Sequence, residues 1–227
     1  MSCKGDNQML RCELLKLKNT ISLYLIVSFS LLEILLIPLY VSFVPNGFSL
    51  TNLAILSFLC YPLLTVFLSI LGIEQEKHSN QYQEISSYPK KRRLWLAKLL
   101  IADLILSLPS LLSWISINLL LKHSLDGFVV SLSSWMLIIF LNHFHYLTQV
   151  SLNSASNIII SMVEIIFIIF ASNKVFLSIH WLPIAFPINS ILIGDWRQLT
   201  TLPLWIVGVT MLFICSIDFK TKREYKK

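Results

Sequence analysis

The sequence predicts an all-α integral membrane protein with six transmembrane helices. Of the 227 residues, 56% are hydrophobic and only 13% are charged, whereas soluble domains average about 45–50% apolar and about 25% charged residues. The apolar residues also form runs long enough to cross a bilayer, which takes about 20 residues per helix. We expect transmembrane spans near residues 21–43, 51–72, 97–121, 128–149, 157–180 and 201–218.

Lysine and arginine are concentrated on one side of these spans. Fifteen of the 18 basic residues lie in the first 20 residues, in segment 73–98 or in the tail 219–227. Basic connections face the cytoplasm in multi-pass proteins, so both termini are predicted to be cytoplasmic. Two termini on one side require an even number of spans, and the basic residues therefore support six.

Two further segments are predicted to be helical without crossing the bilayer. In the N-terminal region 1–20, leucines recur at helical spacing from Leu10 to Leu17, which predicts an amphipathic interfacial helix over 8–21. Between the fifth and sixth spans, a mixed segment contains two prolines and Gly194. It is too interrupted to span, so we expect short outer re-entrant or interfacial helices, with Trp181 and Trp196 near the headgroups.

Acidic residues inside apolar runs are the first candidate functional residues. Glu33 and Glu164 lie within spans, where a charge costs about 2.5–3.5 kcal/mol on insertion scales. Each acid either lines a substrate path or subunit seam, or is a protonated or hydrogen-bonded structural acid. Asp103 and Asp218, near the ends of spans, are expected to pair with Lys98 and Lys220.

The chain offers little sequence evidence for catalysis. No two of its six glycines have the spacing of a phosphate-binding loop, so the chain cannot carry an ATP site of that kind itself. The four cysteines favour neither a disulfide framework nor a zinc site. His143 and His145 could suggest an intramembrane metalloprotease, but residues two apart point to different helix faces. Hydrogen bonding between helices is the preferred interpretation of both histidines.

Segment 73–98 is the longest of the predicted cytoplasmic connections. Gln81, Ile85 and Tyr88 fall on one side of a short helix, and Pro89 then disfavours helical geometry at Tyr88. The following basic run, 90–93, is expected at the level of anionic lipid headgroups. These features predict a helix–break–helix element that projects from the membrane.

This segment resembles the loop between the second and third spans of ABC-type-2 transporter permeases. The similarity is carried by Gly72, Glu74, Glu76, Asn80, Pro89, Arg93, Ala97 and Lys98. In that family the loop is a coupling helix that docks on a separate ATP-binding subunit. The resemblance therefore implies an ATPase-coupling role for Glu74, Glu76, Asn80, Tyr82, Glu84, Ile85, Tyr88, Pro89, Arg93 and Lys98.

The run before the first span, with Glu13, Lys16 and Lys18, is similar to the lantibiotic-protection (bacteriocin immunity) subgroup, as is the C-terminal DFKTKRE. The resemblance implies a permease subunit that exports a cationic antimicrobial peptide. It would pair with an identical or homologous permease in membrane lipid, and ATP and Mg²⁺ would bind to cytoplasmic partner subunits. This chain would bind no cofactor, no metal and no nucleic acid. The alternatives are a non-transporting membrane sensor or scaffold and, less favoured, an intramembrane protease.

Overall fold

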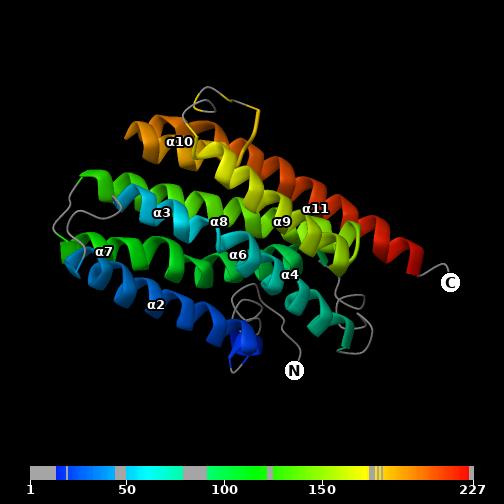
Figure 1. The fold of residues 1–227 in the computed structure, drawn as a ribbon. Helices are drawn as coiled ribbons and strands as arrows, with labels where there is room; N and C mark the ends of the chain where they lie inside the picture. The colour runs from blue at the N-terminus through cyan, green and yellow to red at the C-terminus, as the bar shows by residue number, and fades with distance from the viewer. Residues whose placement is uncertain are drawn as a thin grey trace.

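The computed structural model describes residues 14–18, 20–43, 50–78, 91–121, 125–173, 177, 179 and 181–224. These residues form helices and no strand, and six of the helical segments are long and apolar enough to cross a membrane (Figure 1), which confirms the predicted all-α membrane fold. The elements are α2 (Ile21–Phe43), α3 (Leu50–Phe58), α4 (Tyr61–His78), α6 (Lys91–Ser107), the π-helical turn η1 (Leu108–Leu112), α7 (Ser113–Leu121), α8 (Leu125–Ser151), α9 (Ser154–Ala171), α10 (Ala185–Ile193), the 3₁₀ turn η3 (Trp196–Thr201) and α11 (Leu202–Glu224).

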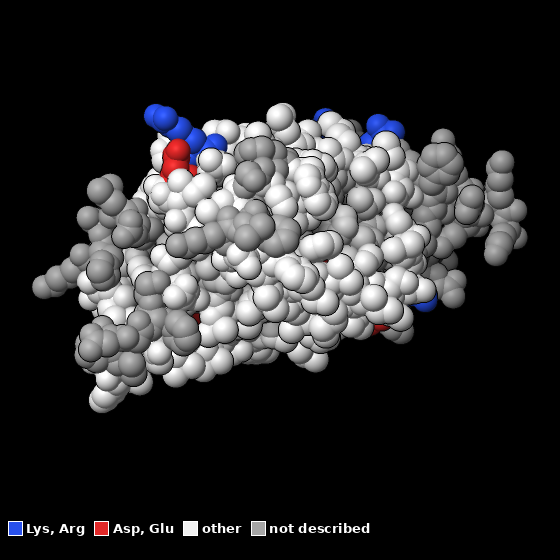
Figure 2. Space-filling model, turned by 45° about the horizontal axis from the view of Figure 1, so that its top comes forward, with Lys and Arg blue, Asp and Glu red and all other residues white. Residues whose placement is uncertain are grey.

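Helix α8 forms the centre of the bundle. It packs against α4, α6, α9, α10 and α11, while α2 lies on the outside against α7 and η1 (Figure 1). The outer helices α2, α9 and α11 expose large apolar side chains such as Leu35, Ile159 and Met211. On the face drawn in Figure 2, the charged side chains that the structure describes lie near the rim and ends, and the described atoms between them are uncharged. An apolar belt of this kind suits contact with lipid.

The second span is interrupted. It consists of α3 and α4, which are separated by a turn at Leu59 and Cys60. Pro62 follows the turn, and it has no N–H with which to continue the α-helical ladder. Helix α4 then runs to His78, six residues beyond the predicted end of this span.

Other predicted span limits also change. The fifth helix begins at Ser154 because Asn153 caps it, its side chain accepting a hydrogen bond from the Ser156 N–H at 2.8 Å. That helix ends at Ala171, so the predicted limit of residue 180 is wrong. The third span remains continuous past Pro109 by widening into η1, where the N–H of Ser113 bonds to the carbonyl of Leu108.

The segment between the fifth and sixth spans contains the short helices that were expected. Helix α10 is buried almost throughout and packs on α8 and α9, which makes it an inserted helix rather than one lying on the surface. It ends at Gly194, whose φ of 76° is the left-handed conformation that glycine adopts readily. Trp181 and Trp196 lie at either side of α10 in sequence and are exposed.

The described part of the N-terminal region forms a single helical turn over residues 14–17. Thr20 separates this turn from α2, donating to the Leu17 carbonyl at 2.8 Å. Ile21 therefore belongs to the first span and not to the predicted interfacial helix, and Leu10 lies outside the described residues.

One end of the bundle, which we call the basic end, collects the elements that carry most described basic side chains. The start of α2, the end of α4, the start of α6 and the end of α11 all lie there (Figure 1). The described side chains at this end include Lys16, Lys77, Arg92, Arg93 and Lys98.

Candidate functional site

An ion-pair cluster joins three elements at the basic end. The side chain of Glu76 on α4 is only 2% exposed, and its Oε1 lies 2.5 Å from Lys98 Nζ on α6. Lys16, from the N-terminal turn, reaches the same oxygen at 3.4 Å. Lys98 also donates to the Gly72 carbonyl at 3.3 Å. Glu76 therefore connects the two helices that flank residues 79–90 with the segment that precedes the first span.

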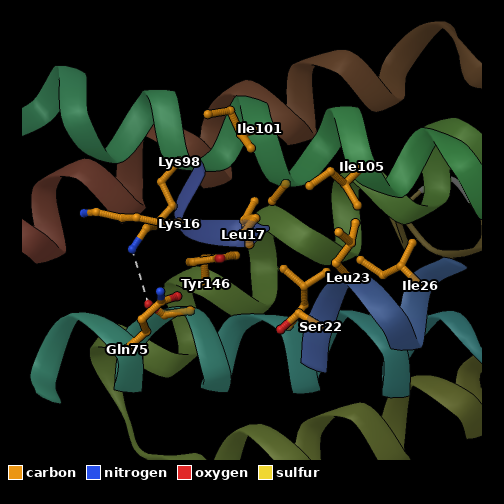
Figure 3. Close-up of a pocket in the computed structure, with 13 residues that line it drawn as sticks. Lys16, Leu17, Ser22, Leu23, Ile26, Gln75, Lys98, Ile101, Ile105 and Tyr146 are labelled. Carbon is orange, nitrogen blue, oxygen red and sulfur yellow. Dashed lines mark hydrogen bonds between the residues drawn. The ribbon is translucent and has the colours of Figure 1, made fainter. Parts of the chain in front are cut away.

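A small cavity lies beside this cluster (Figure 3). It is enclosed by the N-terminal turn, α2, α4, α6 and α8, and its polar lining includes Lys16, Lys98 and Tyr146. The cavity measures about 30 Å³, which is room for one or two water molecules. It is too small for a peptide and is therefore not a substrate site.

A close helix approach positions Tyr146 in this cavity. Gly72 on α4 faces Tyr146 on α8, and a Cβ atom added at Gly72 would lie 2.5 Å from the tyrosine hydroxyl. Only glycine therefore lets the two helices meet at this distance without displacing Tyr146.

The residues predicted to form the coupling loop divide into three groups. Glu76 and Lys98 are held in the cluster, whereas Glu74 on α4 and Arg93 on α6 are exposed at the basic end. The remaining predicted residues, Asn80, Tyr82, Glu84, Ile85, Tyr88 and Pro89, lie outside the described residues.

A first carboxylate–histidine pair lies between α6 and α8. Asp103 accepts from Asn142 at 2.8 Å, and its other oxygen lies 2.8 Å from His143 Nε2. The prediction that Asp103 pairs with Lys98 is therefore wrong, because Lys98 turns to Glu76 on the neighbouring helix. Asp218 belongs to the part of α11 whose side chains are not described, so its predicted pairing with Lys220 remains untested.

The number of protons on the Asp103–His143 pair follows from the other hydrogen bonds that His143 makes. His143 Nδ1 lies 2.6 Å from the Thr210 hydroxyl, which also lies 2.6 Å from the Ile206 carbonyl. When Thr210 gives its one hydrogen to Ile206, Nδ1 must donate, and a second proton is then needed between Nε2 and Asp103. The pair is neutral overall whichever partner holds that second proton, which suits an apolar bundle.

A second pair lies on the opposite side of α8. His145 is fully buried, and its Nε2 lies 2.8 Å from Glu164 Oε2 on α9, without the alignment of a hydrogen bond. Its Nδ1 lies 2.8 Å from Asn157 Oδ1. Asn157 also donates to Ser69 on α4 at 3.0 Å and to Gln149 at 3.0 Å. One polar network thus joins α4, α8 and α9.

These two pairs confirm that His143 and His145 hydrogen-bond between helices and point to different sides of α8. Among the described residues, no group of three histidine, cysteine, aspartate or glutamate side chains is placed to hold a metal ion. The arrangement can position helices, since each pair links α8 to a neighbouring helix.

Asn157 and Asn142 were not singled out from the sequence, whereas Glu164 was. Asn157, Ser161 and Glu164 form the buried stripe of α9, and their spacing of four and three residues is a helical signal visible in NIIISMVE. Glu33 lies on the equivalent stripe of α2, with Ile26, Ser30 and Ile37. No spacing signal identified Asn142, whose partner comes from another span.

No protein-family model matches this chain, and no curated protein matches it either.

Proposed function

We propose that this multi-pass membrane protein is the permease subunit of an ATP-driven ABC exporter. The observation that carries the proposal is the three-way contact at Glu76. The ends of α4 and α6, which lead into and out of residues 79–90, are joined to each other and to the N-terminal turn. A partner that pushed on residues 79–90 would therefore move the second and third spans as one unit.

The proposed orientation places the basic end in the cytoplasm of a bacterial cell. The positive-inside rule supports this, because the two terminal regions and segment 73–98 carry 15 of the 18 lysines and arginines. A cytoplasmic ATPase subunit would bind there and hold the ATP and Mg²⁺. The ATPase must contact its permease differently in its two nucleotide states, since equal binding to both shifts no population.

The proposed substrate is a cationic amphipathic antimicrobial peptide, removed from the membrane to protect its producer. The support comes from the resemblance of the N-terminal and C-terminal runs to lantibiotic-protection permeases. The chain would act with a second permease, identical or homologous.

The test is affinity purification of the tagged chain in mild detergent, followed by mass spectrometry. We expect a stoichiometric partner that contains a phosphate-binding loop. A partner without such a loop, bound equally with and without nucleotide, would favour the sensor or scaffold. A variant Glu76→Lys should retain the partner but stimulate its ATPase less, whereas Lys77→Glu, an exposed neighbour on α4, should behave as wild type.

A further inference from the structure

The carboxylate of Glu33 is buried and unpaired near the middle of the first span. Glu33 is the thirteenth residue of the 23 in α2, and 6% of its surface is exposed. Neither carboxylate oxygen forms a hydrogen bond of ordinary geometry among the described residues, although the Ser57 side chain on α3 lies near enough to interact with the carboxylate. Intramembrane acids of this kind face a partner or a cavity, because an isolated one is costly. Something is therefore expected to meet this carboxylate.

The element that faces Glu33 is the break in the second span. Phe29, one turn before Glu33 on α2, packs its ring 6.3 Å from the ring of Tyr61, the first residue of α4. Glu33 itself lies near Ser57 on α3, near Cys60 in the turn and near Tyr61 at the start of α4. The carboxylate thus lies opposite the α3–α4 turn.

The break supplies a further acceptor. Because Pro62 has no N–H, the Phe58 carbonyl loses the donor that an unbroken helix would give it. The Cys60 N–H closes a tighter turn instead, bonding to the Ser57 carbonyl at 3.0 Å. Carbonyls at the broken ends of membrane helices are recurrent ligands for cations. A carboxylate and such a carbonyl together suit a positively charged donor group.

We propose that Glu33 and the α3–α4 break form an intramembrane site for the primary ammonium group of an amphipathic molecule. An ammonium has three N–H donors. In this site the two Glu33 oxygens would accept two of them, and the Phe58 carbonyl would accept the third. The Tyr61 hydroxyl would border the site, but it already forms a hydrogen bond with the Ser134 hydroxyl at 2.6 Å.

The approach to this site is from the lipid. Cys60, in the turn, is exposed, and so are Leu32 and Leu36 beside Glu33 on α2. A ligand could leave its apolar part in the bilayer while its ammonium reaches the carboxylate. Only the identity of the natural ligand, a cationic amphipathic peptide, rests on the proposed export function.

The test uses the purified full-length chain in detergent and n-hexylammonium as the probe. A ligand that binds only the folded state raises the unfolding temperature as its concentration increases. We expect a saturable rise of a few degrees for the wild type and for Glu164→Gln, which removes the buried acid of the fifth span. We expect no rise for Glu33→Gln. Hexyltrimethylammonium, with the same charge but no N–H donor, should give a much smaller rise.

A rise that persists in Glu33→Gln would overturn the site, as would no rise in the wild type. An equal rise with hexyltrimethylammonium or with sodium chloride would overturn the assignment to a primary ammonium. If Glu33→Gln does not fold, Glu33→Asp serves in its place, and an unchanged response would count against the proposal. No ATPase subunit is present in this assay, so its result is independent of the co-purification that tests the export function.

Discussion

The Nε2 atom of His145 lies 2.8 Å from a carboxylate oxygen of Glu164, and both side chains are buried. Asn157 holds the other ring nitrogen at 2.8 Å. Asn157 comes from α9, as does Glu164, so both ring nitrogens of His145 face that helix. The pair therefore joins α8 to α9 as one unit.

Breaking that unit should be costly. His145→Ala leaves Glu164 buried without a partner, and the expected loss in free energy of unfolding is about 3–5 kcal/mol. In a double-mutant cycle with Glu164→Gln, measured by unfolding in mixed micelles, we expect a coupling of about 0.5–3 kcal/mol. The matched cycle of His143→Ala with Glu164→Gln should be additive within about 0.5 kcal/mol. Equal coupling in the two cycles would contradict the pairing.

The Glu76–Lys98 pair permits a charge exchange. Glu76→Lys and Lys98→Glu each place like charges together in a mostly buried position, so each should lower stability by about 3–5 kcal/mol. The double exchange should recover part of that loss, because the pair is restored in reverse. It should not recover all of it, since Lys16 would then face Lys at position 76. Unfolding in mixed micelles measures this, and no recovery would show that the pair does not join α4 to α6.

Gly72 should not tolerate a side chain while Tyr146 is present. Gly72→Ala places a methyl group 2.5 Å from the tyrosine hydroxyl, and overpacking of this kind costs about 1–3 kcal/mol. Adding Tyr146→Phe removes the clashing oxygen and should lessen the loss. Gly208→Ala is the control, because a Cβ there meets no atom within 4 Å. A loss at Gly208 equal to that at Gly72 would argue against the close approach.

The Tyr61 hydroxyl joins three spans. It lies 2.6 Å from the Ser134 hydroxyl and accepts from Trp114 Nε1 at 3.3 Å. Tyr61→Phe leaves the buried indole N–H without that acceptor, an expected cost of about 1–3 kcal/mol. Ser134→Ala should cost less, because Tyr61 can still donate to the Pro109 carbonyl, 3.3 Å away. The two variants are compared by unfolding in detergent, and the reverse order would contradict this role for Tyr61.

The sequence determined the membrane class and the number of spans. Apolar run length is a property of each segment alone, and a bilayer of fixed thickness selects runs of that length. The buried stripe of α9 could also have been predicted, since Asn157, Ser161 and Glu164 follow helical spacing. Two departures from the predicted spans have local causes that the sequence contains. Pro62 interrupts the second span, and Asn153 caps the fifth helix, which therefore begins earlier than predicted.

Only the tertiary structure decided which polar groups meet. Lys98 is five residues from Asp103 in sequence, yet it pairs with Glu76, while Asp103 pairs with His143. The same packing brought Glu33 opposite the α3–α4 break. A partner in a helical bundle depends on which faces of two helices touch, and those faces are set by the packing of many apolar side chains at once. The composition and residue spacing of one segment therefore do not predict which helix faces will pack together.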